Sequence, residues 1–395
     1  MSRSKLIEMA KRNLAHVKAG TVDQAPGVGR VPVTNYYDPE RWKLEIDRIF
    51  KRLPLMLGFS SELRNPGDYR ALHVADVPVL LTRVKDGSVR AFLNVCAHRS
   101  AVVVPDGNGN ARRFTCPYHA WTYDNEGRMV GIFKRDQFGD VDASCHGLTA
   151  LPVAERAGLI FVVLTPGAAI DFDAFLCGYD EVLAHHRFDQ CHVAGRQSIP
   201  GPNWKVAYDG YLDFYHLPIL HRETFGPKFP SDALYDAFGP HQRVSIPTPG
   251  YLELENLPEE KWKTESMIAG VWTIFPHVSI TDFDAGGKIY LVSQLFPGST
   301  PDDSITVQNF LATFDPDEDQ QKKIESTMKF LEHVVRDEDY FTGNRIQKAL
   351  KTGARSDCLF GRNEAGGQRF HRWVEALIRA DDDQLPKLFR EGVAL

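Results

Sequence analysis

The chain has 395 residues, of which 43% are hydrophobic, and 46 Lys and Arg against 52 Asp and Glu give it a formal net charge of −6. This apolar content can build a large core and excludes a disordered chain. The mild acidity argues against nucleic acid as a partner, because phosphate binding needs a basic surface. The first 20 residues lack the central apolar stretch of a secretory signal. The longest strongly apolar run, residues 159–164, is far shorter than the roughly 18 residues of a membrane span. We therefore expect a cytoplasmic protein of two or three domains.

Two helices are expected near the N-terminus. Residues 5–19 carry apolar side chains at helical spacing, and residues 38–55 continue with a second helix. Asp38 is the expected N-cap of the second helix, because Pro39 follows it at the first helical position.

The pattern then changes to short apolar runs separated by Gly, Asp, Asn and Pro, from about residue 68 to residue 165, which is typical of a small antiparallel β-module. Further along, helices are expected at 171–188, 203–217 and 316–351, and strands mainly at 267–312. Asp315 is the expected cap of the last helix, since Pro316 and several acids follow. The sequence thus predicts an α+β fold with an all-β domain inserted near its N-terminus.

Two short motifs combine cysteine with histidine. Cys96 and His98 form a C-x-H pair, and after seventeen intervening residues Cys116 and His119 form a C-x-x-H pair. Each pair lies where a hairpin tip is expected, so the two loops can close over one metal group. A structural zinc ion accepts this four-ligand set. So does a [2Fe–2S] cluster in which two cysteines hold one iron and two histidines hold the other.

The two motifs resemble those of Rieske iron–sulfur domains, which share this pattern and a tryptophan-rich second loop, here containing Trp121. The resemblance implies a [2Fe–2S] cluster held by the four Cys and His residues. Trp121 and Tyr123 are expected to shield its sulfur atoms, which tunes the potential of such clusters. The chain has Ser100 and Ala120 where the family usually has glycine.

A second group of candidate ligands lies in residues 203–221. On a helix, Asp213 and His216 are three residues apart and share a face. His216 and His221 are five apart and are turned about 140° from each other. Both reach one metal only if the helix deforms or stops between them, and Pro218 lies there. Two imidazoles and one carboxylate are the ligands of non-haem Fe(II) oxygenases, so a third ligand is needed.

The acidic segment of the expected C-terminal helix can supply that ligand. The apolar stripe of this helix directs Asp337 away from the core, whereas Glu338 and Asp339 flank the stripe about equally. Periodicity therefore excludes Asp337 and does not choose between the other two.

The histidine segment resembles the N-W-K…D-x-x-H-x-x-x-x-H signature of the large subunit of Rieske non-haem iron ring-hydroxylating oxygenases. In that family a late E-D-x7-Q helix supplies the carboxylate, and Glu338, Asp339 and Gln347 match it. The resemblance implies an Fe(II) ion held by His216, His221 and Asp339.

The same resemblance implies a route for electrons. Asp213 connects the iron ligand His216 to the cluster ligand His119 of a neighbouring subunit, in a homotrimer arranged head to tail. The chain has Tyr208 and Asp209 where many relatives have Glu-Asn, so no role is transferred to that position. An accompanying β subunit is left open.

The resemblance also implies three regions. Residues 1–55 are N-terminal helices that pack on the catalytic domain, residues 56–165 are the Rieske [2Fe–2S] domain, and residues 166–395 are a mononuclear-iron catalytic domain with a central antiparallel sheet of helix-grip type. No dinucleotide fingerprint is present, because the segments 27–33 and 107–112 lack its third Gly and its strand–helix frame. Electrons are therefore expected from a separate NAD(P)H-dependent reductase, with or without a ferredoxin.

The expected function is that of an oxygenase component that uses O2 to hydroxylate an aromatic or other hydrophobic small molecule. Oxidative O- or N-demethylation is an alternative with the same metal sites, and an electron-transfer protein or a zinc-stabilised protein are the other classes. Apolar candidates for the substrate pocket are Leu212, Leu217, Trp272, Phe275, Phe283, Leu291 and Phe296.

Overall fold

The structure is a computed structural model that describes residues 2–394. The chain forms a larger unit, Met1–Ile49, Asp173–Arg187 and Cys191–Leu395, and a smaller unit, Phe50–Phe172 and Phe188–Gln190. An all-β unit is thus inserted in an α+β unit, which confirms the predicted fold class. The predicted boundaries after residues 55 and 165 stay a prediction. Within residues 2–394, every helix is too short or too polar to cross a lipid bilayer.

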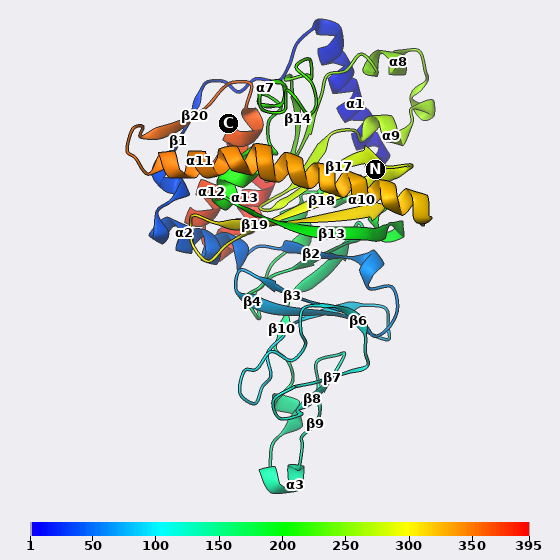
Figure 1. Ribbon diagram of the computed structural model, residues 1–395, viewed down its shortest axis with the longest axis vertical. Coiled ribbons are helices and arrows are strands. Elements are labelled where there is room, and N and C mark those ends of the chain that lie inside the picture. Colours follow the sequence, from blue (N-terminus) through cyan, green and yellow to red (C-terminus); the bar gives the residue numbers. More distant parts are fainter. Residues whose placement is uncertain (1, 395) are drawn as a thin grey trace. The chain divides into compact units, whose positions relative to one another are not determined.

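The smaller unit contains three antiparallel sheets, with the strand orders β10-β5-β4-β3-β6, β11-β12-β2 and β7-β8-β9. The strands are β2 Leu55–Phe59, β3 Asp68–Val74, β4 Val77–Arg83, β5 Val89–Leu93, β6 Gly107–Asn110, β7 Arg113–Thr115, β8 Thr122–Asp124, β9 Met129–Gly131, β10 Ala150–Leu151, β11 Val153–Arg156 and β12 Leu159–Val162. Short helical turns are η3 Ser60–Glu62, α3 Arg135–Phe138, η4 Ala143–Cys145 and η6 Phe188–Gln190. Within this unit, β7–β9 and α3 lie at the end opposite β2 (Figure 1). This is the predicted β-module.

The larger unit is centred on a seven-stranded antiparallel sheet in the order β13-β19-β18-β17-β16-β15-β14. Its strands are β13 His192–Gly201, β14 Leu234–Phe238, β15 His241–Ser245, β16 Val271–Ile274, β17 Val278–Asp284, β18 Lys288–Pro297 and β19 Ser304–Ala312. Strands β16 to β19 correspond to the strands predicted at 267–312. The sequence does not predict β13, because this edge strand is built largely from Gly, Arg, Gln, Ser and Pro and lacks apolar alternation.

Helices and a two-stranded sheet, β1 Gly29–Pro32 with β20 Asp357–Phe360, complete the larger unit. The helices up to residue 267 are α1 Ser2–Ala19, η1 Val33–Tyr36, α2 Pro39–Glu45, η2 Ile46–Phe50, α4 Phe172–Leu176, α5 Tyr179–Leu183, η5 Ala184–His186, α6 Trp204–Asp209, α7 Leu217–Leu220, α8 Tyr251–Glu255, η7 Glu259–Lys261 and α9 Thr264–Met267. Those that follow are α10 Glu318–His333, η8 Val334–Asp339, α11 Tyr340–Leu350, α12 Ala365–Arg379, η9 Asp382–Gln384 and α13 Leu385–Glu391.

Two predicted helices are shorter or more divided than expected. The helix predicted at 38–55 begins as expected, with the Asp38 side chain accepting from Glu40 N–H, but it ends at Phe50. The apolar residues from Leu55 onward form a buried strand instead, and Pro54 separates the two elements. The helix predicted at 171–188 is interrupted at Cys177 and Gly178, which both adopt left-handed backbone conformations.

The long helix predicted at 316–351 extends from Glu318 to Leu350, and all three of its segments, α10, η8 and α11, contact the edge strand β13 (Figure 1). Its N-cap is Asp317 and not Asp315. The Asp317 carboxylate accepts from the backbone N–H groups of Asp319 and Gln320, and the Gln320 side chain accepts from the Asp317 N–H in return. The middle of the helix, η8, is π-helical.

A buried ion cluster fixes the N-terminal helices to the segment that enters the active site. The Glu45 carboxylate in α2 is fully buried and accepts from Trp204 Nε1 at 2.9 Å and from Lys205 Nζ, both in α6. Arg41 Nε donates to the same carboxylate at 2.9 Å. Burial lowers the pKa of Lys205, and Glu45 opposes this effect. The position of α6 therefore depends on Glu45.

We expect Glu45→Ala to lower the free energy of unfolding by about 3–5 kcal/mol, because it leaves the buried Lys205 without a counter-charge. Urea unfolding followed by circular dichroism measures the change. Glu40→Ala is the matched control, since Glu40 in the same helix is exposed and pairs only with the exposed Lys43. Equal urea midpoints for the two variants would contradict the assigned role of Glu45.

Candidate metal centres and active-site cavity

The segment with the two candidate iron histidines is a short helix between turns. The predicted helix 203–217 is wrong beyond Asp209, where α6 ends. Asp213 Oδ1 accepts from the backbone N–H of His216 at 3.1 Å, so the Asp213 side chain stabilises a turn. Pro218 lies in the first turn of α7 and begins this helix. His216 and His221 consequently stand directly before and after α7.

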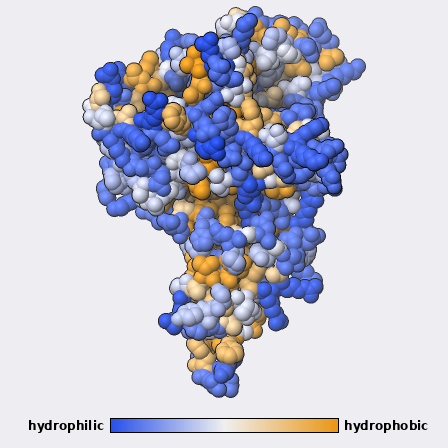
Figure 2. Space-filling view, in the orientation of Figure 1, coloured by the Kyte–Doolittle hydropathy of each residue, from blue (hydrophilic) through white to orange (hydrophobic). Residues whose placement is uncertain are grey.

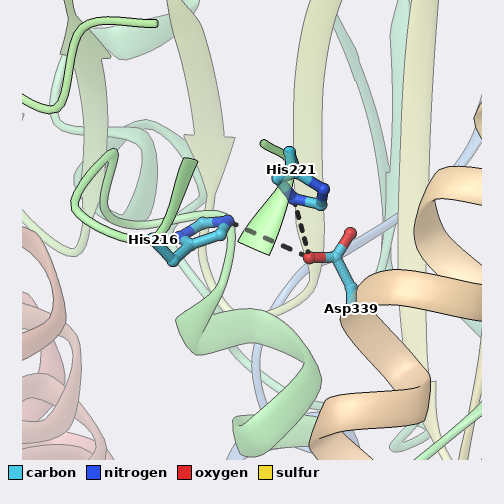
Figure 3. Close-up of side chains that lie close together, drawn as sticks. All are labelled: His216, His221 and Asp339. Atoms are coloured by element: carbon cyan, nitrogen blue, oxygen red, sulfur yellow. Dashed lines mark ion pairs between the residues drawn. The ribbon is translucent and has the colours of Figure 1, made fainter. Parts of the chain in front are cut away.

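Three ligand atoms from two distant parts of the chain converge here. His216 Nε2 lies 3.9 Å from Asp339 Oδ1, and His221 Nε2 lies 3.1 Å from the same oxygen (Figure 3). The three ligand atoms are all within 4.8 Å of one another. The structure thus brings together His216, His221 and Asp339, the three residues that the family resemblance implies, and their role as iron ligands stays a prediction.

Each histidine is oriented by a second carboxylate. His216 Nδ1 donates to Asp213 Oδ1 at 3.0 Å, and His221 Nδ1 donates to Glu338 Oε2 at 2.5 Å. Because a carboxylate accepts and does not donate, each Nδ1 carries a proton, and a metal ion bound with Asp339 would take the place of a proton on Nε2. Two neutral imidazoles and one carboxylate suit a divalent iron ion with open coordination positions.

The π-helical η8 explains why both Glu338 and Asp339 reach His221. A π-turn contains an extra residue, so neighbouring side chains are displaced from α-helical spacing. Asp339 contacts Nε2 of His221 and Glu338 contacts Nδ1, whereas Asp337 is exposed and pairs with His333 and Arg336. The exclusion of Asp337 by periodicity is therefore consistent with its exposure.

Sequence reasoning misses the role of Glu338, because the periodicity that it uses assumes a regular α-helix. Besides its contact with His221, Glu338 accepts a hydrogen bond from the Thr224 hydroxyl. Burial alone would raise the pKa of Glu338, but the hydrogen bonds from His221 and Thr224 outweigh burial and lower it. Glu338 is thus held as a carboxylate behind the histidine.

A second buried network surrounds Asp209. Tyr36 OH and His371 Nε2 each donate to the Asp209 carboxylate at 2.9 Å. Glu364 lies nearby, and its pKa is raised by burial and by the charges of Asp213 and Asp209. The carboxyl groups of Asp209, Asp213 and Glu364 therefore lie close together in one wall of the site.

The metal triad lies in the wall of a cavity of about 1070 Å³ within the larger unit. Most of its lining is apolar, with an aromatic group around His221 formed by Phe225, Phe229 and Phe330. Of the seven predicted pocket residues, Leu217, Phe283 and Leu291 line the cavity. The others, Leu212, Trp272, Phe275 and Phe296, are buried elsewhere in the core. Strand alternation accounts for part of this division, since Val271 lines the cavity and the next residue, Trp272, faces the opposite way.

The two Cys/His loops of the smaller unit share one backbone conformation. In each loop the cysteine N–H donates to a carbonyl five residues later at 2.8 Å, and the cysteine carbonyl accepts from an N–H four residues later at 3.0 Å. The residues that donate are Ser100 after Cys96 and Ala120 after Cys116. Both have φ of 56°, the left-handed region that favours glycine. The two positions at which the chain departs from the family pattern thus keep the glycine conformation.

The loops place two thiols and two imidazoles at one end of the smaller unit. Cys96 and Cys116 are buried and unpaired by disulfide bonds, and the rings of His98 and His119 are 4.7 Å apart. Among residues 2–394, His216, His221 and Asp339 are the residues whose three ligand atoms all lie within 4.8 Å of one another. The ligand atoms of the two cysteines and two histidines are spread more widely than that. Separate thiol and imidazole pairs fit a two-iron cluster better than a single tetrahedral zinc ion.

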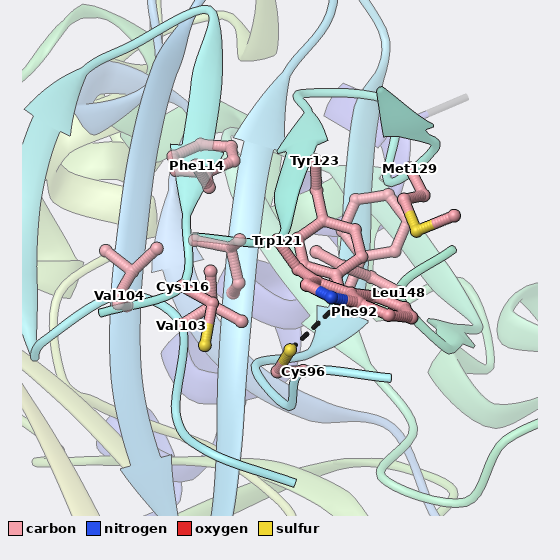
Figure 4. Packing of buried hydrophobic residues seen from close by; sticks show 12 residues of the cluster. Phe92, Cys96, Val103, Val104, Phe114, Cys116, Trp121, Tyr123, Met129 and Leu148 are labelled. Atoms are coloured by element: carbon pink, nitrogen blue, oxygen red, sulfur yellow. Dashed lines mark hydrogen bonds between the residues drawn. The ribbon is translucent and has the colours of Figure 1, made fainter. Parts of the chain in front are cut away.

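Aromatic side chains cover both kinds of ligand. Tyr123 OH accepts from the Ala97 N–H at 3.0 Å. The same hydroxyl forms a hydrogen bond with Cys96 Sγ at 3.2 Å (Figure 4). Trp121 stacks on the His98 ring with centroids 4.9 Å apart. Tyr123 therefore contacts a sulfur atom as expected, whereas the ring that Trp121 covers is the His98 imidazole, and shielding of sulfur by Trp121 stays a prediction.

The surface around the cluster histidines carries several exposed apolar side chains among polar ones. Figure 2 shows hydrophobic surface over the region where β7–β9 and α3 lie in Figure 1. Its exposed side chains include Tyr118, Val130, Phe133 and Phe138. Phe138 packs edge-on against His98 with centroids 5.3 Å apart. Exposed apolar surface of this kind is typical of a contact site for another protein.

We expect Glu338→Gln to weaken binding of Fe(II) about 10- to 100-fold, because the amide no longer fixes the His221 tautomer as a carboxylate does. Competition with a coloured chelator measures the iron affinity. Asp337→Asn changes the neighbouring exposed residue in the same way and should leave the affinity unchanged. Unchanged iron affinity in Glu338→Gln would show that this contact has no part in the metal site.

Comparisons with known proteins agree with this geometry. Residues 54–144 match the Rieske [2Fe-2S] domain, and residues 188–380 match the ring hydroxylating alpha subunit (catalytic domain). The glycine betaine monooxygenase oxygenase subunit of Chromohalobacter salexigens is 30% identical over 64% of this chain and 56% of its own length. The chlorobenzene dioxygenase subunit alpha of a Cupriavidus species is 36% identical over 48% of this chain and 43% of its own length.

The chain thus spans about half the length of these curated relatives. A crystal structure of the quaternary ammonium Rieske monooxygenase CntA with an inhibitor shares the fold, with a TM-score of 0.76, 23% identity and coverage of 91% of this chain and 100% of that chain. The chain therefore belongs to the family of Rieske non-haem iron oxygenase large subunits, with a [2Fe–2S] cluster and a mononuclear iron as its cofactors.

Proposed function

We propose that the chain is the oxygenase component of a multicomponent Rieske system that uses O2 to hydroxylate a hydrophobic small molecule. The observation that carries this proposal is the position of the His216, His221 and Asp339 ligand atoms in the wall of a large, mostly apolar cavity. In this proposal the three residues hold Fe(II), and the cavity binds the substrate beside it. The iron supplies O2 activation, while the cavity positions the substrate and excludes water.

We propose Cys96, His98, Cys116 and His119 as the ligands of the cluster, which stores one electron for the reaction. The Tyr123 hydroxyl, by donating to Cys96 Sγ, would stabilise negative charge on that sulfur and so raise the cluster potential. Support comes from the burial of both cysteines and from the adjacent histidine rings.

Electrons would reach the iron between subunits. We propose that His119 of one subunit bonds to Asp213 of a neighbouring subunit, which already accepts from His216 Nδ1. The exposed apolar side chains beside the cluster support a protein contact there. A homotrimer arranged head to tail is the assembly that would repeat this contact around a closed ring.

The electrons would come from a separate NAD(P)H-dependent reductase, with or without a ferredoxin. All strand pairs among the described residues are antiparallel, whereas a dinucleotide-binding fold requires a parallel βαβ unit. This arrangement supports a division of labour in which the chain holds the oxygenase metals and another protein binds the nicotinamide.

Metal analysis of ligand variants tests the two proposed sites separately. The wild-type protein should hold about three iron ions and two sulfide ions per chain and be red-brown. His221→Ala should lose about one iron and all product formation while keeping the visible spectrum. Cys116→Ala should lose that spectrum. A colourless wild-type protein that contains zinc would overturn the proposal.

The electron route has its own test. We expect Asp213→Asn to keep the visible spectrum and most of the iron but to form almost no product, since an amide cannot accept hydrogen bonds as an ionised carboxylate does from two imidazoles. Reoxidation of the reduced cluster by O2 with substrate present should slow in parallel. Asp232→Asn, at an exposed position, is the control. Normal turnover by Asp213→Asn would contradict the route.

A further inference from the structure

The active-site cavity has an unusual charge pattern. Among the described residues that line it, none is Lys or Arg. Its acidic lining residues are Asp209, Asp213, Glu253, Asp282, Asp339 and Glu364. Histidines His216 and His221 complete the set of titratable side chains other than tyrosines. The cavity therefore offers no fixed cation besides the bound metal.

The acids differ in how their charges act on the cavity. Asp282 alternates with Thr281 and Phe283 along β17 and pairs with Lys288 at 3.4 Å, so a cation outside the cavity lining compensates it. Glu253 is exposed and stands in α8. The remaining acidic lining residues lie around the metal site and are Asp209, Asp213, Asp339 and Glu364.

A bound Fe(II) ion would not reverse this pattern. Its two positive charges would be offset by the carboxylate of Asp339 and by that of Glu338, which bonds to the far side of His221. Asp213 and Asp209 add further negative charge. Asp213 accepts from the backbone N–H and the imidazole of His216, and Asp209 accepts from an imidazole and a phenol. The raised pKa of Glu364, caused by burial and by these two neighbours, is a sign of crowding by like charges.

We propose that the substrate is a hydrophobic molecule without a negative charge, and that neutral and cationic compounds bind in preference to carboxylates of the same shape. This inference rests on the proposed function of the cavity as the substrate site. A carboxylate that enters an apolar cavity loses its hydration and needs a cation or several donors in return. The lining provides carboxylates and no Lys or Arg, and carboxylates repel an anion and attract an ammonium group.

Three compounds with one ring system test this preference in the anaerobic holoenzyme. The cavity is large enough for a bicyclic ring, so the probes are 2-naphthylmethanol, 2-naphthylmethylammonium and 2-naphthoate. Isothermal titration calorimetry should give dissociation constants for the first two that are about 100-fold lower than that of 2-naphthoate. Equal binding of 2-naphthoate, or no binding of any of the three, would overturn the inference.

A charge reversal provides an independent readout. Glu253→Lys places a cation in the lining and should tighten binding of 2-naphthoate several-fold at low salt while weakening that of the ammonium compound. Glu255→Lys, in the same helix but outside the lining, makes the same change in net charge and should shift neither. Identical shifts in both variants would count against a charge effect in the cavity.

Binding and turnover separate this inference from the proposed function. Tight binding of the neutral and cationic compounds without O2-dependent product would support the charge preference and contradict oxygenation of these compounds. Hydroxylation of 2-naphthoate with high affinity would support the oxygenase function and contradict the charge preference.

Discussion

Two hydrogen bonds to carboxylates determine the geometry of the candidate iron site. The donors are Nδ1 of His216, bonded to Asp213, and Nδ1 of His221, bonded to Glu338. Each bond places the proton on the outer nitrogen, so that both Nε2 atoms are free to face Asp339. The local folds serve this arrangement: the turn stabilised by Asp213 sets His216 before α7, and the π-helical η8 lets consecutive acids contact opposite sides of His221.

The larger unit supports the site from several directions. Glu45 joins α2 to α6 through buried bonds to Trp204 and Lys205, and the sheet contributes Thr281, Phe283 and Leu291 to the cavity. Thr281 in β17 lies directly opposite Leu291 in β18, so both belong to one face of the sheet. The same cavity wall collects carboxylates near the metal and lacks basic residues. The packing of α6 and the sheet sets the shape of the cavity, and the excess of carboxylates sets its charge. Together they determine which molecules can bind beside the iron.

Sequence reasoning identifies what depends on residue type and spacing. The Cys/His pairs, the two histidines that flank α7 and the β17–β19 strands follow from patterns that a regular element or a short motif imposes. It misses features that depend on tertiary contacts. Helix α6 ends at Asp209, and the Asp213 side chain stabilises the turn that replaces the rest of the predicted helix. Asp317 caps the long helix through a reciprocal bond with Gln320. The contact of Glu338 with His221 is missed for a similar reason. The direction of the Glu338 side chain is inferred from the period of a regular α-helix, and the π-turn breaks that period.

The proposed function requires two separate iron environments in one chain. Anomalous X-ray diffraction from crystals of the aerobically purified protein, measured on both sides of the iron and zinc absorption edges, tests this directly. The account predicts iron peaks at two places in each chain, an elongated one between the Cys96 and Cys116 sulfurs and the His98 and His119 rings, and a single one among His216, His221 and Asp339. Zinc peaks at these places, or an iron peak at one place alone in fully loaded protein, would contradict it.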